Sequence, residues 1–317
     1  TERMTSFRIN PSKIGKQQLT PVSWCETGYY LESRPLFTLD PLFHAGAYYV
    51  QEAASMFLEQ IIKPETTRPL RVLDLCAAPG GKTTLVASLL PAGSLLVANE
   101  VIRSRSSILS ENIIKWGSPN CIVTNNDPKD FGFLRGFFDI IIVDAPCSGE
   151  GMFRKNSEAS SEWSPENVDL CSKRQTRILH DIWGCLAPDG MLIYSTCTFN
   201  EKENEDVVVR FIEEKQAQCE SVPLKEEWNI TERHKNGATS YRFFPHKTKG
   251  EGFSVSIIRK NDGDEYSPSK KTQDSKRWVP LSERNSLPYK KYITSPDDFF
   301  FFTNPTGQIG AFPQEYK

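Results

Sequence analysis

The sequence predicts an α/β protein in which helices cover both faces of a mostly parallel β-sheet. Strand-like and helix-like segments alternate from Leu70 to about Lys260, the pattern of strands joined by crossover helices. The run Phe138–Val143 is rich in β-branched apolar residues, as expected of a central strand buried on both faces. The chain has 317 residues, more than one such unit of about 200 residues requires, so accessory segments are also expected.

The expected elements follow one another in chain order. The last helix has Asn200 as its expected N-cap and acidic residues in its first turn. The last two strands lie close together in the chain, so one of them is expected to run antiparallel at the sheet edge. We expect strands at Arg71–Leu75, Leu95–Asn99, Asn120–Thr124, Phe138–Val143, Met191–Ser195, Glu220–Pro223 and Phe253–Arg259, and helices at Gln51–Ile62, Lys82–Leu90, Ile102–Trp116, Leu170–Leu186 and Glu201–Glu214.

Both ends of the chain differ in composition from the middle. Residues 1–50 are rich in aromatics, prolines and turn residues and are interpreted as a small N-terminal accessory α+β unit; because the chain begins without Met, we expect this unit to be truncated. Residues 51–260 form the expected main domain. Residues 261–317 are interpreted as a polar linker and the start of a C-terminal accessory region. The four consecutive phenylalanines Phe299–Phe302 are expected to pack against other residues.

Composition excludes several classes of function. The apolar runs are too short to span a bilayer, and residues 1–10 lack a signal-peptide core. The eight cysteines form no Cys-x-x-Cys pair and the four histidines are scattered, so no metal site is expected. The net charge of −2 argues against indiscriminate nucleic-acid binding but leaves room for local basic patches. We expect a cytoplasmic monomer.

A glycine-rich turn joins the first strand to the next helix in the segment Val72–Thr84. Gly80 and Gly81 let backbone amides approach a ligand. Gly81-Lys82-Thr83 also matches the end of a P-loop, but the first glycine of that motif would fall at Cys76. The alternative is a nucleoside cofactor on a Rossmann-like sheet.

The Rossmann-like alternative predicts an acidic residue at the end of the second strand. Glu100 is found there, Asp127 follows the third strand and Asp144 the fourth. Ligands of such sheets bind at the carboxyl ends of the strands, where the strand order reverses. Three acids in register with the turn favour this alternative over an NTPase.

Two cysteines follow strands that are expected to be neighbours. Cys147 follows the strand ending at Val143, and Cys197 follows the strand ending at Ser195. An isolated cysteine is usually a small buried apolar residue, but two cysteines in turns at one edge of the sheet indicate chemistry. A thiolate added to carbon 6 of cytosine makes carbon 5 nucleophilic enough to take a methyl group; a second group then assists release. Asp144 is placed to bind the ring near N3 and N4.

These segments resemble the Sun-type RNA cytosine-5 methyltransferases, in the bacterial branch that acts on small-subunit ribosomal RNA. The resemblance covers about Ser6 to Lys260. It is specific because Pro146-Cys147 and Thr196-Cys197 occur in order with the Ala-Pro-Gly-Gly-Lys turn. Further similar segments are Tyr48–Met56, Trp163–Pro165, Phe244–His246 and Gly250–Phe253.

The resemblance implies a Rossmann-like class I methyltransferase fold with a seven-stranded sheet. It also implies S-adenosylmethionine as the cofactor and RNA as the substrate, with 16S rRNA as the expected molecule. Cys197 is the implied nucleophile, Cys147 assists release, and Asp144 contacts the cytosine. Lys155 is a candidate for contact with the substrate, and the accessory regions at residues 1–50 and 261–317 are implied to bind RNA. The implied cofactor residues are Cys76, Ala77, Ala78, Pro79, Gly80, Gly81, Lys82, Glu100, Arg105, Asp127 and Asp144.

Four other functions stay open at this point. A tRNA cytosine-5 methyltransferase would use the same residues. A DNA cytosine-5 methyltransferase would attack from the Pro-Cys cysteine, so that Cys147 would be essential and Cys197 dispensable. An amino-group methyltransferase, which Asp144–Cys147 half resembles, would need neither cysteine. A binding protein without catalysis is not favoured, because every expected catalytic position is filled.

Overall fold

The computed structural model describes residues 4–154, 160–161, 163–263, 265–267 and 279–316. The chain forms two compact units, Thr1–Tyr266 and Ser267–Lys317. All of the candidate site residues of the sequence analysis except Lys155 are described, and they lie in the first unit; Lys155 falls outside the described residues.

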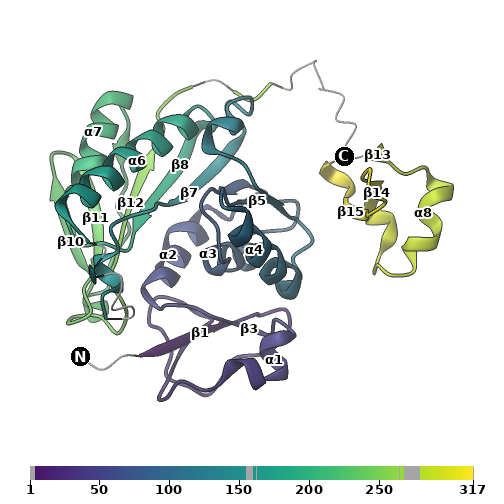
Figure 1. Cartoon of the computed structure of the whole chain (residues 1–317), viewed down its shortest axis with the longest axis horizontal. Helices are drawn as coiled ribbons and strands as arrows, with labels where there is room; N and C mark the ends of the chain where they lie inside the picture. The colour runs from purple at the N-terminus through teal and green to yellow at the C-terminus, as the bar shows by residue number, and fades with distance from the viewer. Residues whose placement is uncertain (1–3, 155–159, 162, 264, 268–278, 317) are drawn as a thin grey trace. The chain divides into compact units, whose positions relative to one another are not determined.

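A large mixed sheet forms the centre of the first unit (Figure 1). Among the described residues it has nine strands, in the order β10-β11-β12-β8-β7-β4-β5-β6, and β9 pairs with β12. The strands are β4 (Arg71–Asp74), β5 (Leu95–Asn99), β6 (Cys121–Thr124), β7 (Phe138–Asp144), β8 (Leu186–Thr196), β9 (Gln218–Cys219), β10 (Thr231–Lys235), β11 (Ala238–Phe243) and β12 (Phe253–Arg259).

The five strands from β8 to β6 are parallel, whereas β12, β11 and β10 continue the sheet in antiparallel pairings. The strand order reverses between β4 and β7: β5 and β6 extend the sheet on one side and β8 on the other. A crevice at such a switch point is where ligands of open α/β sheets bind. Asp144, the last residue of β7, is the register partner of Ser195 on β8.

Helices cover the sheet on two sides. The apolar side chains of α2 and α3 pack on residues such as Val72, Ile140 and Ile193 of the strands, in the largest buried cluster. The connection from β7 to β8 crosses in the opposite direction along the sheet, so right-handed crossovers place α6 on the other face. There α6 and α7 are joined by ring contacts of Phe211 with His180 and Trp183. The α-helices of this unit, among its described residues, are α1 (Pro41–His44), α2 (Leu58–Ile62), α3 (Gly81–Leu89), α4 (Arg103–Trp116), α6 (Pro165–Trp183) and α7 (Glu205–Lys215).

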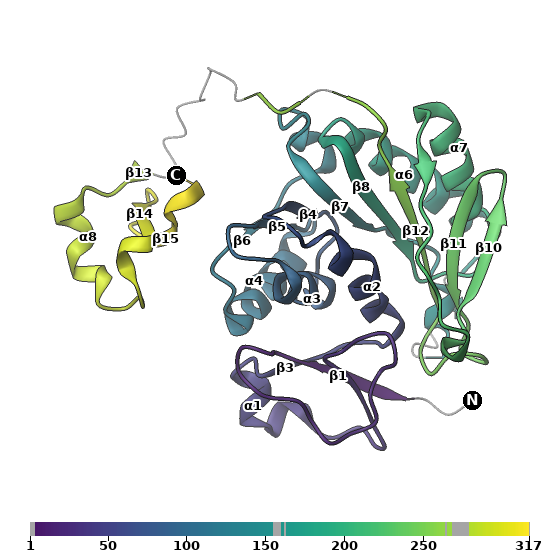
Figure 2. The ribbon, with the colours of Figure 1, turned by 180° about the vertical axis from the view of Figure 1, so that it is seen from behind.

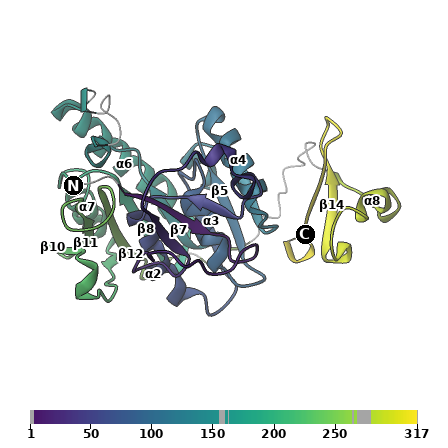
Figure 3. The same ribbon diagram turned by 90° about the horizontal axis from the view of Figure 1, so that it is seen from below.

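A small antiparallel sheet, β2-β1-β3, precedes the large one (Figures 2 and 3). Its strands are β1 (Thr5–Ile9), β2 (Gly28–Leu31) and β3 (Tyr48–Val50). Arg8 of β1 is fully buried, and its guanidinium donates to Gln51 Oε1 at 3.0 Å, Thr84 Oγ1 at 2.6 Å and Gly81 O at 3.4 Å. The N-terminal sheet is therefore fastened to the start of α3.

The second unit consists of a three-stranded antiparallel sheet and one α-helix among its described residues. Its elements are β13 (Val279–Pro280), α8 (Glu283–Lys290), β14 (Phe299–Thr303) and β15 (Ile309–Pro313). The phenylalanine run forms β14, with Phe301 buried and Phe300 packed against Phe312.

The elements differ from the sequence expectations in four places. The strand expected at Glu220–Pro223 is not formed; the two-residue β9 precedes that segment and the hairpin of β10 and β11 follows it, so the sheet has nine strands rather than seven. The helix expected at Gln51–Ile62 is broken into a 3₁₀ segment (Ala54–Phe57) and α2. Helix α6 begins at Pro165, with the Ser164 hydroxyl capping Asn167 N. Helix α7 begins only at Glu205, and Asn200 is not its N-cap.

Candidate active site

The glycine-rich turn lies directly after β4, at the switch point of the sheet. Gly80 has a φ of 114°, a left-handed conformation that favours glycine, and a Cβ there would lie 3.3 Å from Leu109. The turn is held by side chains of α4: Arg105 Nη2 donates to Ala78 O at 2.9 Å and Asn112 Nδ2 to Pro79 O at 2.8 Å. The backbone of the turn is thus fixed before any ligand arrives.

Two buried carboxylate oxygens beside the turn have no hydrogen-bond partner among the described residues. Asp74 is fully buried and accepts from Thr83 Oγ1 at 2.7 Å through Oδ2, which leaves Oδ1 without a partner. Burial raises the pKa of Asp74 to about 7. Glu100 Oε2 also lacks a hydrogen bond and lies 3.4 Å from Arg105 Nη1. Buried polar atoms of this kind fit a ligand that carries amino and hydroxyl groups, as a nucleoside cofactor does.

The third candidate acid is engaged differently. Asp127 caps the 3₁₀ helix Pro128–Phe131 by accepting from Lys129 N, and it lies 3.4 Å from Arg177. It stands at the carboxyl end of β6, as predicted, with its side chain used in a cap.

Asp144 connects three elements at the crevice. Its Oδ2 accepts from Lys82 Nζ at 2.7 Å, and its Oδ1 accepts from Ser195 Oγ at 2.8 Å. Burial alone would lower the pKa of Lys82, but the attraction of Asp144 and its hydrogen bond outweigh burial and raise it. The ammonium of Lys82 is therefore a fixed positive charge beside the cysteines.

Cys147 and Cys197 meet at the ends of β7 and β8, with their sulfur atoms 3.2 Å apart. The pKa of Cys197 is lowered, chiefly because Cys147 donates a hydrogen bond to it and also because of Lys82, although burial and Asp144 act in the opposite direction. The same hydrogen bond, together with burial, raises the pKa of Cys147 well above its ordinary value. The pair is thus asymmetric: Cys197 is the thiol that ionises more readily, and Cys147 is the one that holds its proton.

A cavity of about 300 Å³ opens onto Cys197. It is lined by the predicted residues Cys76, Ala77, Ala78, Pro79, Gly81, Lys82, Asp144 and Cys197. Gly80, Glu100, Arg105, Asp127 and Cys147 are not among its lining residues. The thiol of Cys76 has a raised pKa because it is buried.

Gln51 and Glu52 also line this cavity, and the sequence analysis assigned them no role. Burial raises the pKa of Glu52, whose Oε1 accepts from Glu251 N at 2.7 Å. The available signal was the segment Tyr48–Met56, which was recognised as similar to the family without a function for any of its side chains.

A buried carboxylate that the sequence analysis missed holds both cysteine turns. Glu203 accepts from Ser148 N at 2.9 Å and from Gln175 Nε2 at 2.8 Å through Oε2, and from Asn200 Nδ2 at 2.7 Å through Oε1. Ser148 and Thr198 hydroxyls lie 3.0 Å apart, next to the two cysteines. The signal that identifies Glu203 is its position just after the Thr-Cys turn, three residues beyond Asn200.

The backbones of two further turns touch beside Cys197. Gly151 N donates to Cys197 O at 2.8 Å, and a Cβ on Gly151 would lie 2.7 Å from Gly252 O. A Cβ on Gly252 would lie 2.6 Å from Gly151 Cα and 2.3 Å from Phe199. Neither position has room for a side chain.

The described residues contain neither a cluster of metal-binding side chains nor a membrane-spanning helix. No group of three or more His, Cys, Asp or Glu side chains there is arranged to hold a metal ion. None of the helices in that part of the chain has the length and apolar character to cross a membrane.

The strand order around the glycine-rich turn, with the antiparallel β12 next to β8, and the match to a solved methyltransferase homologue place this fold among the Rossmann-like class I methyltransferases, whose methyl donor is S-adenosylmethionine, as predicted. The family model described as 16S rRNA methyltransferase RsmB/F matches residues 60–259, and that of the N-terminal domain of 16S rRNA methyltransferase RsmF matches residues 1–53. The chain belongs to the RsmB/F family. Membership confirms the predicted family and excludes the P-loop NTPase.

Named relatives agree with this assignment. The chain is 38% identical over 274 residues to ribosomal RNA small subunit methyltransferase F of Salmonella paratyphi A, a match that covers 80% of this chain and 57% of that protein. The chain thus spans little more than half the length of such relatives.

Solved structures from Pyrococcus horikoshii share the fold. A methyltransferase homologue is 27% identical with a TM-score of 0.68, covering 82% of this chain and 87% of that one. The structure of NSun6 with SFG is 26% identical with a TM-score of 0.60, covering 74% and 58%.

Proposed function

We propose that this protein transfers the methyl group of S-adenosylmethionine to carbon 5 of a cytosine in 16S rRNA, through a covalent bond between Cys197 and carbon 6. The observation that carries the proposal is the cysteine pair, whose sulfur atoms lie 3.2 Å apart and of which Cys197 lines the same cavity as the glycine-rich turn. The relatives named as small-subunit RNA methyltransferases support the substrate, and such a substrate implies the cytoplasm as the compartment.

The side chains divide the chemistry among them. The Cys197 thiolate adds to carbon 6 of the ring, and the electron pair of the 5,6 double bond becomes available at carbon 5. Each oxygen of Asp144 accepts one hydrogen bond in the protein and has a second lone pair for the N4 amino group of cytosine. The Lys82 ammonium donates to Asp144 and favours the thiolate form of Cys197. The cofactor supplies an electrophilic methyl group.

Release reverses the addition. The proton on carbon 5 leaves to a base, the 5,6 double bond forms again, and the Cys197 sulfur departs as a thiolate. Cys147, in contact with that sulfur, assists this departure. The buried oxygens of Asp74 and Glu100 are proposed to bind polar groups of the cofactor, with the turn Cys76–Lys82 along its side.

The mechanism is tested with unmodified 16S rRNA transcribed in vitro and labelled S-adenosylmethionine. Cys197→Ala is expected to abolish methyl transfer. Cys147→Ala is expected to leave a covalent RNA–protein adduct that survives denaturation and appears as a slow band on a denaturing gel. Cys219→Ala, at a cysteine on β9 outside the site, is the matched control and keeps full activity. A fully active Cys197→Ala variant would refute the mechanism.

A further inference from the structure

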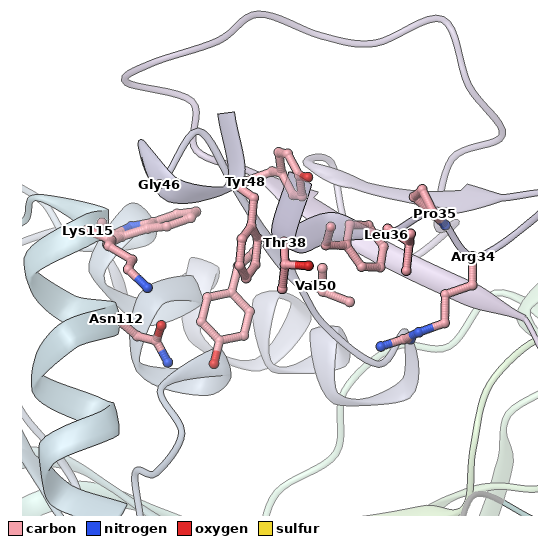
Figure 4. Close-up of a pocket in the computed structure, with 13 residues that line it drawn as sticks. Arg34, Pro35, Leu36, Thr38, Gly46, Tyr48, Val50, Asn112 and Lys115 are labelled. Carbon is pink, nitrogen blue, oxygen red and sulfur yellow. The ribbon is translucent and has the colours of Figure 1, made fainter. Parts of the chain in front are cut away.

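A second cavity, of about 370 Å³, lies between residues 34–50 and helix α4 (Figure 4). Its walls come from the loop after β2, from α1, from β3 and from the end of α4. Its volume lies at the lower end of the range of about 300–1,000 Å³ that is typical of small-ligand sites. The mechanism above makes no use of it.

Five aromatic side chains line this cavity, which we call the aromatic pocket: Phe37, Phe43, Tyr48, Tyr49 and Trp116. Tyr48 is the centre of the group, with ring centroids 6.1 Å from Phe37 and 5.9 Å from Phe43. Its hydroxyl donates to Asp40 at 2.7 Å, which fixes the ring. At the rim, Leu36 is 74% exposed. Fixed aromatic rings beside exposed apolar surface suit the stacking of a nucleobase.

The charged side chains that line the aromatic pocket are basic, which suits phosphate. None of the 13 described residues that line it is acidic, although the net charge of the chain is −2. Lys115 on α4 and Arg34 on the loop after β2 reach toward the cavity from opposite sides (Figure 4). The buried Arg8 guanidinium lies 4.5 Å from the centroid of the Trp116 ring and adds a positive charge beneath this wall.

The aromatic pocket adjoins the cavity of about 300 Å³ beside Cys197, here called the catalytic cavity. Tyr49 and Val50 line both cavities. Asn112, which lines the aromatic pocket, donates to Pro79 O of the glycine-rich turn at 2.8 Å. The two cavities therefore lie close enough for one strand of RNA to occupy both.

We propose that the aromatic pocket holds an unstacked base of the substrate RNA, a neighbour of the target cytidine in the same strand, with Arg34 and Lys115 on its phosphates. This inference rests on the proposed function and adds a second site of RNA recognition, formed mainly by residues 34–50. Bases gripped on aromatic rings are a usual means by which proteins bind single-stranded RNA.

The proposed phosphate contacts are tested with Arg34→Ala/Lys115→Ala. The control is Arg68→Ala/Lys225→Ala, which removes two exposed cations that lie outside both cavities. With 16S rRNA transcript, the RNA concentration at half-maximal rate is expected to rise about tenfold in the first variant, with the maximal rate unchanged. Two lost phosphate contacts also reduce the slope of log Kd against log salt by about 1.4. Equal half-saturation and slope in the two double variants would overturn the proposal.

The base part is tested with Phe43→Leu, which keeps an apolar side chain and removes the ring, and with photo-crosslinking. Transcripts that carry 4-thiouridine are irradiated with the wild-type protein, and crosslinked peptides are identified by mass spectrometry. We expect crosslinks in residues 34–50 or 112–116 and a several-fold rise in half-saturation for Phe43→Leu. Crosslinks confined to other peptides, with unchanged half-saturation, would refute base binding. Failure of the proposed function is distinguishable, because wild-type protein would then not methylate the transcript at all.

Discussion

Removing the thiol of Cys147 should raise the pKa of Cys197. The hydrogen bond from Cys147 is the largest influence that lowers this pKa. A hydrogen bond to a charged group is worth about 1.5–3 kcal/mol, and a thiol is a weak donor, so we take the lower value. One pKa unit corresponds to about 1.4 kcal/mol. In Cys147→Ala the pKa of Cys197 should therefore be higher by about one unit.

Alkylation of Cys197 by iodoacetamide, followed by peptide mass spectrometry over a range of pH, measures this shift without RNA or catalysis. The midpoint of the Cys197 curve is expected to move to higher pH in Cys147→Ala. In Cys147→Ser, where a hydroxyl can still donate, it should stay close to that of the wild type. A midpoint in Cys147→Ala that is unchanged or lower would show that Lys82 and the local backbone, rather than the neighbouring thiol, set the ionisation of Cys197.

Two further predictions concern buried carboxylates. Glu203→Gln places an amide donor among N–H and O–H donors, which costs about 1–3 kcal/mol. We expect a lower melting temperature and a roughly tenfold lower maximal rate, with unchanged half-saturation for RNA, whereas the exposed control Glu213→Gln should match wild type. A Glu203→Gln variant with wild-type activity and stability would contradict the positioning role. The pKa of Asp74 is about 7 in the fold and about 3.9 in the unfolded chain, so the free energy of unfolding falls as pH rises from about 4 to about 7. Asp74→Asn removes this dependence. We measure the free energy of unfolding of the variant minus that of wild type by urea unfolding of the apo protein, and expect this difference to be larger at pH 8 than at pH 5 by about 1–3 kcal/mol. The same difference at both values of pH would disprove the raised pKa of Asp74.

The parallel sheet and the meeting of the two cysteine turns could be predicted, because side chains at the carboxyl ends of adjacent strands share one edge. The edge hairpin could not. Strand β10 has the sequence Thr-Glu-Arg-His-Lys and is mostly exposed, so no apolar alternation marks it. Its turn does carry a signal: Asn236 and Gly237 both have positive φ, as an Asn-Gly hairpin turn requires.

Helix ends were predicted less well where side chains compete with the helix for backbone groups. The Ser55 hydroxyl donates to Glu52 O at 2.7 Å, and Ser55 N donates to Glu52 Oε2 at 3.2 Å, within the segment expected to be one regular helix. Glu203 was overlooked for a related reason: a glutamate near a helix start is usually a solvated charge that favours the helix dipole. Only the tertiary fold brings Ser148 and Gln175 to it.

The contact between Gly151 and Gly252 has a mechanical consequence. The backbones of Gly151, in the turn that follows Cys147, and Gly252, in the loop before β12, lie in direct contact. The carbonyl of Cys197 accepts a hydrogen bond from Gly151 at this contact. Even one added methyl group would act as a wedge and force the turns apart. The spacing of the two sulfur atoms therefore depends on two residues that have no side chain and take no part in the chemistry.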